Sequence, residues 1–565
     1  MRSQDSGEMA ARQDAAALIR RIQSLLLAPG EGSSASLPDF IADVLGMVPS
    51  EGDAGHPYLG SAVPDMSWLD PYEAIPDAGL DPRATVGTAL GALGGQIRWE
   101  SPGAVHNVNQ PVLLPAWAAH AVTSLYNPNA LWDLVSGGCL DMERQVTRQL
   151  SGLMGWDARE CDGLFTFGGK AGLIYAIRLG LNRCVPELSR LGLGGARPMV
   201  ITTGQNHYAV DSACSLLGTG TGAVVKVATD RRGAMDADAL EQAVRAGLSA
   251  GRQLACVVLC GGNTLDAVID PVRVASEVLD ELDVIRRFGY RPWLHFDLPL
   301  GWPWLFFRGY DFAANPLGIG SEGLGAAESI AERLADAGLA DSTCFDFHKL
   351  GFSPYPGSVF LTRHWRELRS VFRDERPSAP WLDYGENFRQ HHSIEHSRSA
   401  APIVAAWVVL QVLGRDGFRA YLGQMHQATA RLRSRLAAGG MTVLNADSPS
   451  LATMILPARP AREAAAGQPS SDAAGQDRYT EALFRYIAGL DGQADQPVAI
   501  GFVPGYARPG SDAAPSALRL FTVNPWLDEQ QADVIADRVI SMKKEFDLAW
   551  GQHDAAAPRL LHTPR

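Results

Sequence analysis

The chain has 565 residues, of which 46% are hydrophobic and 20% are charged. A chain of this length and composition can bury a large core, which excludes a disordered, collagen-like or small disulfide-framework protein. The formal net charge of -13 gives no general attraction to nucleic acid or to anionic lipid. We therefore expect neither a nucleic-acid partner nor a membrane partner.

The cysteines are odd in number and scattered, with no CxxC pair and no Cys/His cluster at zinc-ligand spacing. This pattern predicts reduced thiols in a cytoplasmic protein and no metal centre. The charged N-terminus is followed by no secretory apolar segment. No window has 18 apolar residues in a row, so we expect no membrane span.

The first hundred residues predict an N-terminal arm. Residues 14–27 have helical spacing and are followed by Pro29, Gly30 and Gly32, which end a helix. Residues 33–95 are rich in Gly, Pro and Asp, with only short apolar pieces. We expect a helical and irregular arm over residues 1–100.

Residues 101–400 predict a large α/β domain. Two helices are expected within residues 111–155, around the turn YNPN at 126–129. Apolar runs then alternate with helix-length segments, as βα units and a mainly parallel sheet require. The expected strands are residues 198–204, 223–229, 255–262, 292–297, 342–348 and 358–363.

The pattern changes after Ala400. A long helix is followed by the strand-like TVLNA, and residues 459–478 are poor in apolar residues other than Ala, which predicts a flexible surface insertion. Residues 516–525 then predict a strand and precede a closing amphipathic helix. We expect a smaller C-terminal α+β domain over residues 401–565.

Lys349 and Asp297 are the strongest chemical candidates. Each follows or ends an apolar run, and the carboxyl ends of parallel strands form the ligand-binding edge of a sheet. Burial at that edge lowers an amine's pKa and makes it a usable nucleophile. A solvated loop lysine is the usual interpretation of a lone Lys, although the flanking His348 and the Gly/Pro-rich turn weaken it here, and a helix N-cap or turn Asp explains Asp297 about as well as a ligand contact does.

Weaker candidates occur at the ends of other βα units. His207 could stack on a planar ring or carry a proton. Gly169 and Lys170 open a helical run, where free N–H groups suit a phosphate. Thr264 could hydrogen-bond a ligand, and Arg519 could hold a carboxylate through two hydrogen bonds. Turn, capping and surface ion-pair roles stay open for each of them.

The order of these residues resembles the group II pyridoxal-phosphate-dependent amino acid decarboxylases. DFHKLGFSPYPGS is similar to the segment around the family's Schiff-base lysine, and its HK-x-G-x-x-PY form is similar to the bacterial tyrosine decarboxylase branch. HFD, NHYAVDSA and FTFGGK resemble three further family motifs. The likeness extends from about Ser101 to Pro525 and implies fold type I, the aspartate-aminotransferase-like fold.

The resemblance also implies roles. Lys349 would carry pyridoxal 5'-phosphate, Asp297 would pair with its pyridine nitrogen, and His207 would stack on its ring. Arg519 matches an arginine that the glutamate decarboxylase branch associates with the substrate carboxylate, and Tyr384 is nearest in order to the mobile-loop tyrosine. The other implied cofactor contacts are Gly169, Lys170, Ala171, Gly172, Thr264 and His348.

The implied reaction is decarboxylation of an L-amino acid to an amine, with an aromatic substrate favoured over an acidic one, by a homodimer. Several motifs depart from the family. HFDLP brings Leu298 and Pro299 beside the cofactor, Lys170 replaces a hydroxyl residue, and the flanks of Tyr384 do not match. These departures leave open a related enzyme that forms an aldehyde or a coupled product. A non-catalytic relative is the third alternative, but it predicts loss of the cofactor residues, and Lys349, Asp297 and His207 are all present.

Overall fold

The computed structural model describes residues 19–20, 23, 37–48, 55–72, 74–76, 79–372, 389–460, 473–492, 494, 496–507 and 513–553. The chain divides into two compact units, one of residues 1–54 and 58–97, the other of residues 55–57 and 98–565. The first unit contains α2 (Leu37–Gly46), η1 (Ser67–Tyr72), α3 (Pro82–Leu90) and η2 (Gly91–Leu93). The helix expected over residues 14–27 lies almost wholly outside the described residues.

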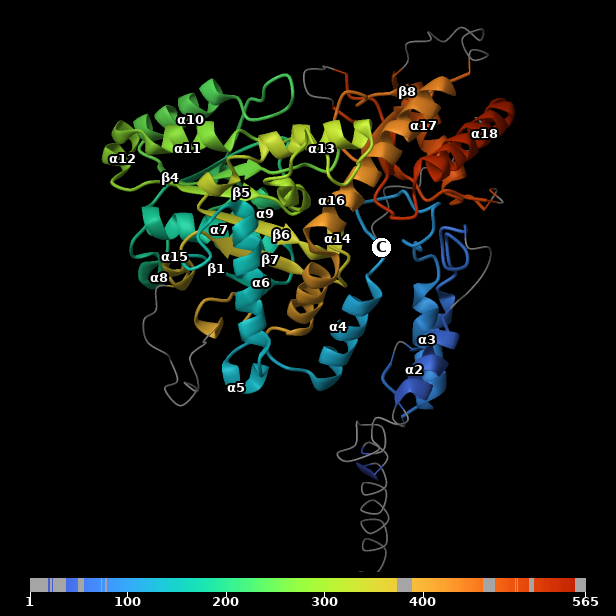
Figure 1. Cartoon of the computed structure of the whole chain (residues 1–565), viewed down its shortest axis with the longest axis horizontal. Helices are drawn as coiled ribbons and strands as arrows, with labels where there is room; N and C mark the ends of the chain where they lie inside the picture. Colours follow the sequence, from blue (N-terminus) through green and yellow to red (C-terminus); the bar gives the residue numbers. More distant parts are fainter. Residues whose placement is uncertain are drawn as a thin grey trace, which may run out of the picture. The chain divides into compact units, whose positions relative to one another are not determined.

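The second unit is built on a seven-stranded sheet with the order β1-β7-β6-β5-β4-β2-β3. Figure 1 labels β1, β4, β5, β6 and β7 of this sheet. The pairs from β6 to β3 are parallel, and β7 is antiparallel to both β6 and β1. The strands are β1 (Asp162–Thr166), β2 (Pro198–Thr203), β3 (Val224–Val227), β4 (Gln253–Cys260), β5 (Trp293–Asp297), β6 (Ser342–Asp346) and β7 (Ser358–Thr362). The expected α/β fold with a mainly parallel sheet is confirmed.

Helices cover both faces of this sheet, which explains why its central strands are apolar throughout. Along β4, Leu254, Val257 and Leu259 pack in one core cluster. Ala255 and Val258 pack in the other. The first cluster is covered by α6 (Cys139–Met154), α10 (Ala237–Ser249), α11 (Val272–Asp280), α13 (Ser321–Arg333) and α16 (Ala401–Ala438), and the second by α7 (Gly169–Cys184), α8 (Leu188–Leu191) and α9 (Ala209–Leu216).

The remaining short helices connect these elements. They are α4 (Leu114–Tyr126), α5 (Asp133–Ser136), η3 (Thr221–Ala223), α12 (Leu282–Phe288), η4 (Trp302–Phe307), η5 (Ala337–Leu339), α14 (Phe347–Leu350), α15 (Trp365–Arg369) and η7 (Arg389–His391). α4 packs against α16.

A four-stranded antiparallel sheet, of order β10-β11-β9-β8, lies in the C-terminal part of the same unit. Its strands are β8 (Thr442–Val443), β9 (Ala452–Leu456), β10 (Gly501–Val503) and β11 (Ala517–Phe521). α17 (Ala473–Ile487), α18 (Glu529–His553) and the end of α16 pack on it around a third apolar cluster.

α16 is, by length and composition, long and apolar enough to cross a membrane. Its Gly414 has φ 58° and ψ -171°, so the backbone is not helical at that point. The helix packs against α4, α6, α13 and α18. Such contacts are those of a core helix, for which a high apolar content is ordinary.

Three expectations from the sequence need correction. Residues 162–166 form the edge strand β1, which the sequence analysis did not anticipate. The run expected as strand to residue 348 leaves the sheet at Asp346, because Phe347–Leu350 form one helical turn. The insertion expected over residues 459–478 ends earlier, since α17 begins at Ala473 and buries Gly475. Residues 461–472 lie outside the described residues.

Gly180 tests how tightly α7 packs on β4. A Cβ at Gly180 would lie 2.3 Å from the carbonyl oxygen of Ala255, whereas a Cβ at Gly152 on α6 would meet no atom within 4 Å. We predict that Gly180→Ala lowers the free energy of unfolding by about 1–3 kcal/mol through overpacking. Gly152→Ala should raise it by up to about 1 kcal/mol. Thermal unfolding of both variants checks this, and equal midpoints would contradict the packing argument.

Candidate functional site

A cavity of about 1020 Å³ opens at the carboxyl edge of the parallel strands. β2, β4, β5 and β6 all end there, so the residues that follow each strand face a common space. Eight residues singled out from the sequence line this cavity: Gly169, Lys170, His207, Thr264, Asp297, His348, Lys349 and Arg519.

The other predicted residues lie elsewhere. Ala171 and Gly172 are buried within α7 and do not line the cavity. A Cβ at Gly172 would lie 2.6 Å from Cys344 Cβ, so the missing side chain makes room for that cysteine. Tyr384 lies outside the described residues.

Lys349 is held by a carboxylate that the sequence analysis missed. Its Nζ lies 2.8 Å from Oδ2 of Asp346, which ends β6. Burial is the largest single effect and acts to lower the pKa of Lys349. The charge and hydrogen bond of Asp346, together with the charge of Asp297, outweigh it and raise the pKa. The pKa of Asp346 is lowered, because Lys349 and the neighbouring groups offset its burial. The unligated amine is therefore an ammonium ion held beside the cavity.

His348 and Tyr355 extend this cluster. The Nδ1 atom of His348 accepts a hydrogen bond from the Gly357 N–H at 3.3 Å, which leaves the proton on Nε2. That Nε2 lies 3.6 Å from Asp346. The ring of Tyr355 lies over the imidazole at 4.1 Å between centroids. Burial lowers the pKa of His348, so the ring is neutral at pH 7.

Asp297 is 5% exposed, and it lines the cavity. The thiol of Cys344 donates to its Oδ1 at 3.0 Å. Nε2 of His295 lies 3.9 Å from the same oxygen. A carboxylate in this position can hold a proton on a ligand atom that reaches the cavity floor.

His207 projects from the segment between β2 and α9. Its Nδ1 accepts a hydrogen bond from the Ala209 N–H at 3.1 Å, so Nε2 carries the ring proton. Burial is the main reason that the pKa of His207 is lowered. A neutral imidazole at the cavity wall can stack on a planar ligand.

The N-terminus of α7 provides an anion site. Its N-cap residue, Gly168, has no side chain to bond the first free N–H groups. Gly169 and the exposed Lys170 both line the cavity. N–H groups at a helix start, with an ammonium beside them, favour a phosphate or carboxylate.

Arg519 provides a second cation, and Gly501 makes room for it. A Cβ at Gly501 would lie 2.8 Å from Arg519 Nε and 3.0 Å from the carbonyl oxygen of His106. Arg519 donates to that carbonyl through Nη2 at 3.2 Å, while its buried Nε has no acceptor among the described residues. Burial lowers the pKa of Arg519. Because Nε has no acceptor within the described part of the chain, the guanidinium can donate hydrogen bonds to a ligand carboxylate.

Thr264 lies in a segment that side chains hold rigidly. Asn263 donates to Gln205 at 3.1 Å and accepts from the Asp266 and Val268 N–H groups. Tyr506 donates to the Asp266 carboxylate at 2.5 Å. The sequence shows no signal for the two long-range bonds of this network, since Gln205 lies 58 residues from Asn263 and Tyr506 lies 240 residues from Asp266.

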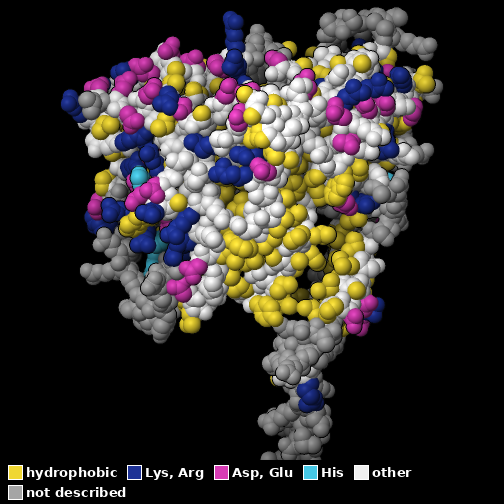
Figure 2. All heavy atoms as spheres, viewed as in Figure 1, with side chains coloured by type: hydrophobic (Ala, Val, Ile, Leu, Met, Phe, Trp, Pro, Cys, Tyr) yellow, Lys and Arg dark blue, Asp and Glu magenta, His cyan; other side chains and the backbone are white. Residues whose placement is uncertain are grey.

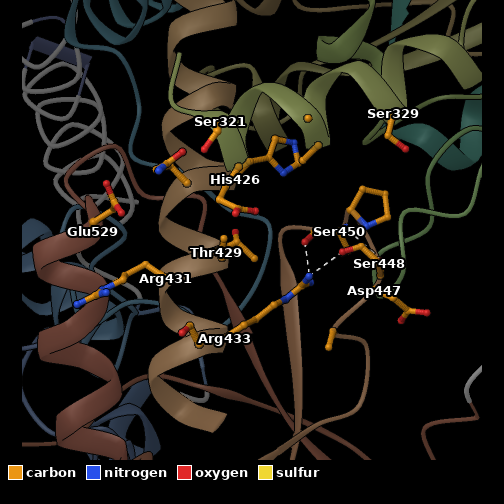
Figure 3. A pocket seen from close by; sticks show the side chains of 18 of the residues that line it. Ser321, Ser329, His426, Thr429, Arg431, Arg433, Asp447, Ser448, Ser450 and Glu529 are labelled. Atoms are coloured by element: carbon orange, nitrogen blue, oxygen red, sulfur yellow. Dashed lines mark hydrogen bonds between the residues drawn. The ribbon is translucent and has the colours of Figure 1, made fainter. Parts of the chain in front are cut away.

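A second, polar pocket of about 690 Å³ lies between α13, α16 and residues 446–450. Arg433 reaches across it to the carbonyl oxygens of Ser448 and Ser450 (Figure 3). A third carbonyl, that of Ala452, also accepts from Arg433. Ser448 in turn donates to the carbonyl of Asp266 at 2.7 Å. Arg433 thus ties α16 to the segment that carries Thr264.

The chain is similar to known amino acid decarboxylases. It is 32% identical over 185 residues to an acidic amino acid decarboxylase of Bos taurus. The aligned segment covers 32% of this chain and 33% of that protein. It is 26% identical over 365 residues to L-2,4-diaminobutyrate decarboxylase of Rhizobium meliloti, which covers 62% of this chain and 66% of that one. The chain thus spans between a third and two thirds of these relatives. No family model matches.

The fold is also similar to a solved structure, that of mouse CSAD in its apo form. The TM-score is 0.71 at 18% sequence identity, and the match covers 90% of this chain and 99% of that one. At this identity the likeness concerns the fold.

The contact between Asp346 and Lys349 can be tested on the protein alone. We predict that Asp346→Asn lowers the pKa of Lys349, because the largest effects that oppose burial, the charge and hydrogen bond of Asp346, are then removed. The chain has only five lysines, so NMR of reductively ¹³C-methylated protein can follow each amine through a pH titration. Lys226, which pairs with Asp211 on the surface, is the internal control. An unchanged Lys349 pKa would contradict the assignment.

Proposed function

We propose that this chain, which belongs to the group II pyridoxal-phosphate-dependent amino acid decarboxylases, removes the carboxyl group of an L-amino acid to give an amine and CO2. The observation that carries the proposal is the meeting of Lys349, Asp297 and His207 in one cavity at the strand ends. These residues bring an amine, a carboxyl group and an imidazole ring into one cavity.

The described residues fit pyridoxal 5'-phosphate. Lys349 is the amine that would hold the cofactor, and Asp297 lines the same cavity and would contact the ring nitrogen. Gly169 and Lys170 line the anion site at the start of α7. His207 offers its neutral ring for stacking. The cavity volume of about 1020 Å³ is large enough for a cofactor and a small substrate together.

Bound there, the cofactor would supply an electron-withdrawing ring that accepts the electron pair left when CO2 departs. The protein's part is orientation and charge. Asp297 would hold a proton on the ring nitrogen, and Lys349 Nζ would be the group that returns a proton to the substrate carbon. Arg519 can bind a substrate carboxylate and so fix which bond faces the ring.

The lining of the cavity supports the proposal that an amino acid with an aromatic side chain is preferred to one with an acidic side chain. Leu265, Leu300, Phe502 and Val503 provide apolar wall. Arg519 can hold one carboxylate, and Lys170 lies at the anion site that the cofactor phosphate would occupy. An acidic substrate would need a further cation for its second carboxylate.

The reaction is tested by incubating the protein with pyridoxal phosphate, air and a panel of L-amino acids, and reading the products by mass spectrometry. We expect an amine formed with loss of CO2, and none with Lys349→Ala. An aldehyde or a coupled product would favour the alternative chemistry. A protein that shows no lysine-dependent yellow colour would contradict the cofactor itself.

Gly501→Ala tests the carboxylate site without removing its charge. The new Cβ would displace the Arg519 guanidinium. We predict a higher KM, on the order of 10-fold if about 1.4 kcal/mol of substrate binding is lost, with a smaller change in kcat. Gly152→Ala, which meets no atom, is the matched control. A KM equal to that of the wild type would exclude Arg519 as the carboxylate site.

We also propose that the chain works as a homodimer. Large apolar side chains are exposed on and near α4, among them Leu114 at 75%, Val122 at 56%, Tyr126 at 72% and Leu134 at 73%. Figure 2 shows hydrophobic side chains gathered over this part of the molecule. An extended apolar surface of this kind is typical of an interface, and a second copy is the partner that the family resemblance implies.

Light scattering after size exclusion tests the homodimer. We expect the mass of two chains for the wild type and of one chain for Leu114→Glu/Tyr126→Glu, because two buried charges oppose association. Val412→Glu, another exposed apolar position at 55%, on α16, is the control. A monomeric wild type would contradict the proposal.

A further inference from the structure

Three metal-binding side chains meet on one face of the sheet, although the sequence spacing predicts no metal centre. His295 and Asp297 are two residues apart on β5, so both project toward the α7 face. Cys344 on β6 pairs directly with Asp297 in the parallel register. Their ligand atoms all lie within 4.8 Å of one another. A strand pair thus presents an imidazole, a carboxylate and a thiol to one point.

The separations suit a small tetrahedral cation. Zinc bound by N, O and S atoms needs ligand atoms roughly 3.3–3.5 Å apart. The distance from Cys344 Sγ to Asp297 Oδ1 is 3.0 Å. That from His295 Nε2 to the same oxygen is 3.9 Å. The two values lie on either side of the required spacing, and the ligand atoms of all three side chains lie within 4.8 Å of one another.

His295 is the independent sign that this cluster has a ligand. The residue is fully buried, and its Nε2 has no hydrogen-bond partner among the described residues. An unsatisfied polar atom in such a site costs free energy, and native structures rarely leave one without a role. Its other nitrogen, Nδ1, lies 2.8 Å from Ser342 Oγ. A metal-ligating histidine typically has its second nitrogen fixed in this way.

We propose that the protein without cofactor binds one thiophilic divalent cation, such as Zn²⁺, through His295 Nε2, Asp297 and Cys344 Sγ. The cation enters from the cavity, on which Asp297 is exposed, and a water on that side completes four ligands. Binding replaces the proton of the Cys344 thiol, which passes to solvent.

The site and the proposed cofactor would exclude each other. Asp297 cannot serve as a metal ligand and hold a proton on the ring nitrogen at the same time. This part of the inference rests on the proposed function, whereas metal binding itself does not. Zinc would then inhibit by keeping the protein in its cofactor-free form.

Co²⁺ is the spectroscopic probe, because a thiolate bound to it gives a charge-transfer band in the near ultraviolet. We expect cofactor-free protein to take up about one equivalent with this band. Cys344→Ser should abolish the band. Cys260→Ser is the matched control: this thiol flanks Asp297 from β4 but donates to the Val268 carbonyl, so the band should persist.

His295→Gln is the second variant. Ser342→Ala removes the hydroxyl that lies beside His295 Nδ1, and we expect it to lower the affinity for Co²⁺ roughly 10–100-fold. Circular dichroism shows whether each variant folds. No thiolate band in the wild type, or a band that survives Cys344→Ser, would overturn the site. Saturation with pyridoxal phosphate should suppress the band, and a band that persists in the yellow protein would overturn the exclusion. A protein that binds Co²⁺ but does not bind pyridoxal phosphate would contradict the proposed function and leave the metal site standing.

Discussion

The parallel register of β4, β5 and β6 is the constraint on which the rest of the site depends. It places Cys260, Asp297 and Cys344 side by side, since each pair is directly aligned across neighbouring strands. Because parallel strands all end at one edge, the segments that follow them share one cavity. The carboxylate, the amine and the imidazole lie close together for that reason, although they are distant in the chain.

Charge balance at this edge decides the state of each group. Asp346 is almost fully buried and would be costly as an isolated anion, and the Lys349 ammonium at 2.8 Å compensates for it. When a ligand bonds to the Lys349 amine, Asp346 loses this ammonium as its partner. The carboxylate then keeps its contacts with Ser358 and His348. The ion pair thus holds the amine in position and gives its release a pH dependence.

Glycines set how closely the layers approach. Gly172 gives Cys344 its space, and Gly501 gives the Arg519 guanidinium its space. In both positions a methyl group would lie within 3.0 Å of a side chain that belongs to the site. The sequence shows these residues only as glycines, since the close neighbour comes from another strand or layer.

Much of the large domain follows from local pattern. Six of the seven strands were expected near their observed positions, because a strand buried on both faces must be apolar along its length. β1 was missed, since Asp162 and Gly163 make a short edge strand resemble a turn. Asp346 was missed as a site residue, because nothing local distinguishes a carboxylate that faces a lysine from one that ends a strand.

The sequence by itself determined the α/β class, the order of the strands along the chain, and the residue types available for chemistry at each strand end. The tertiary structure decided which of these meet. It joined Lys349 to Asp346, set Arg519 against Gly501, and brought His295, Asp297 and Cys344 to one point. Such encounters depend on which strands become neighbours in the sheet, and the order of the strands along the chain does not by itself determine that.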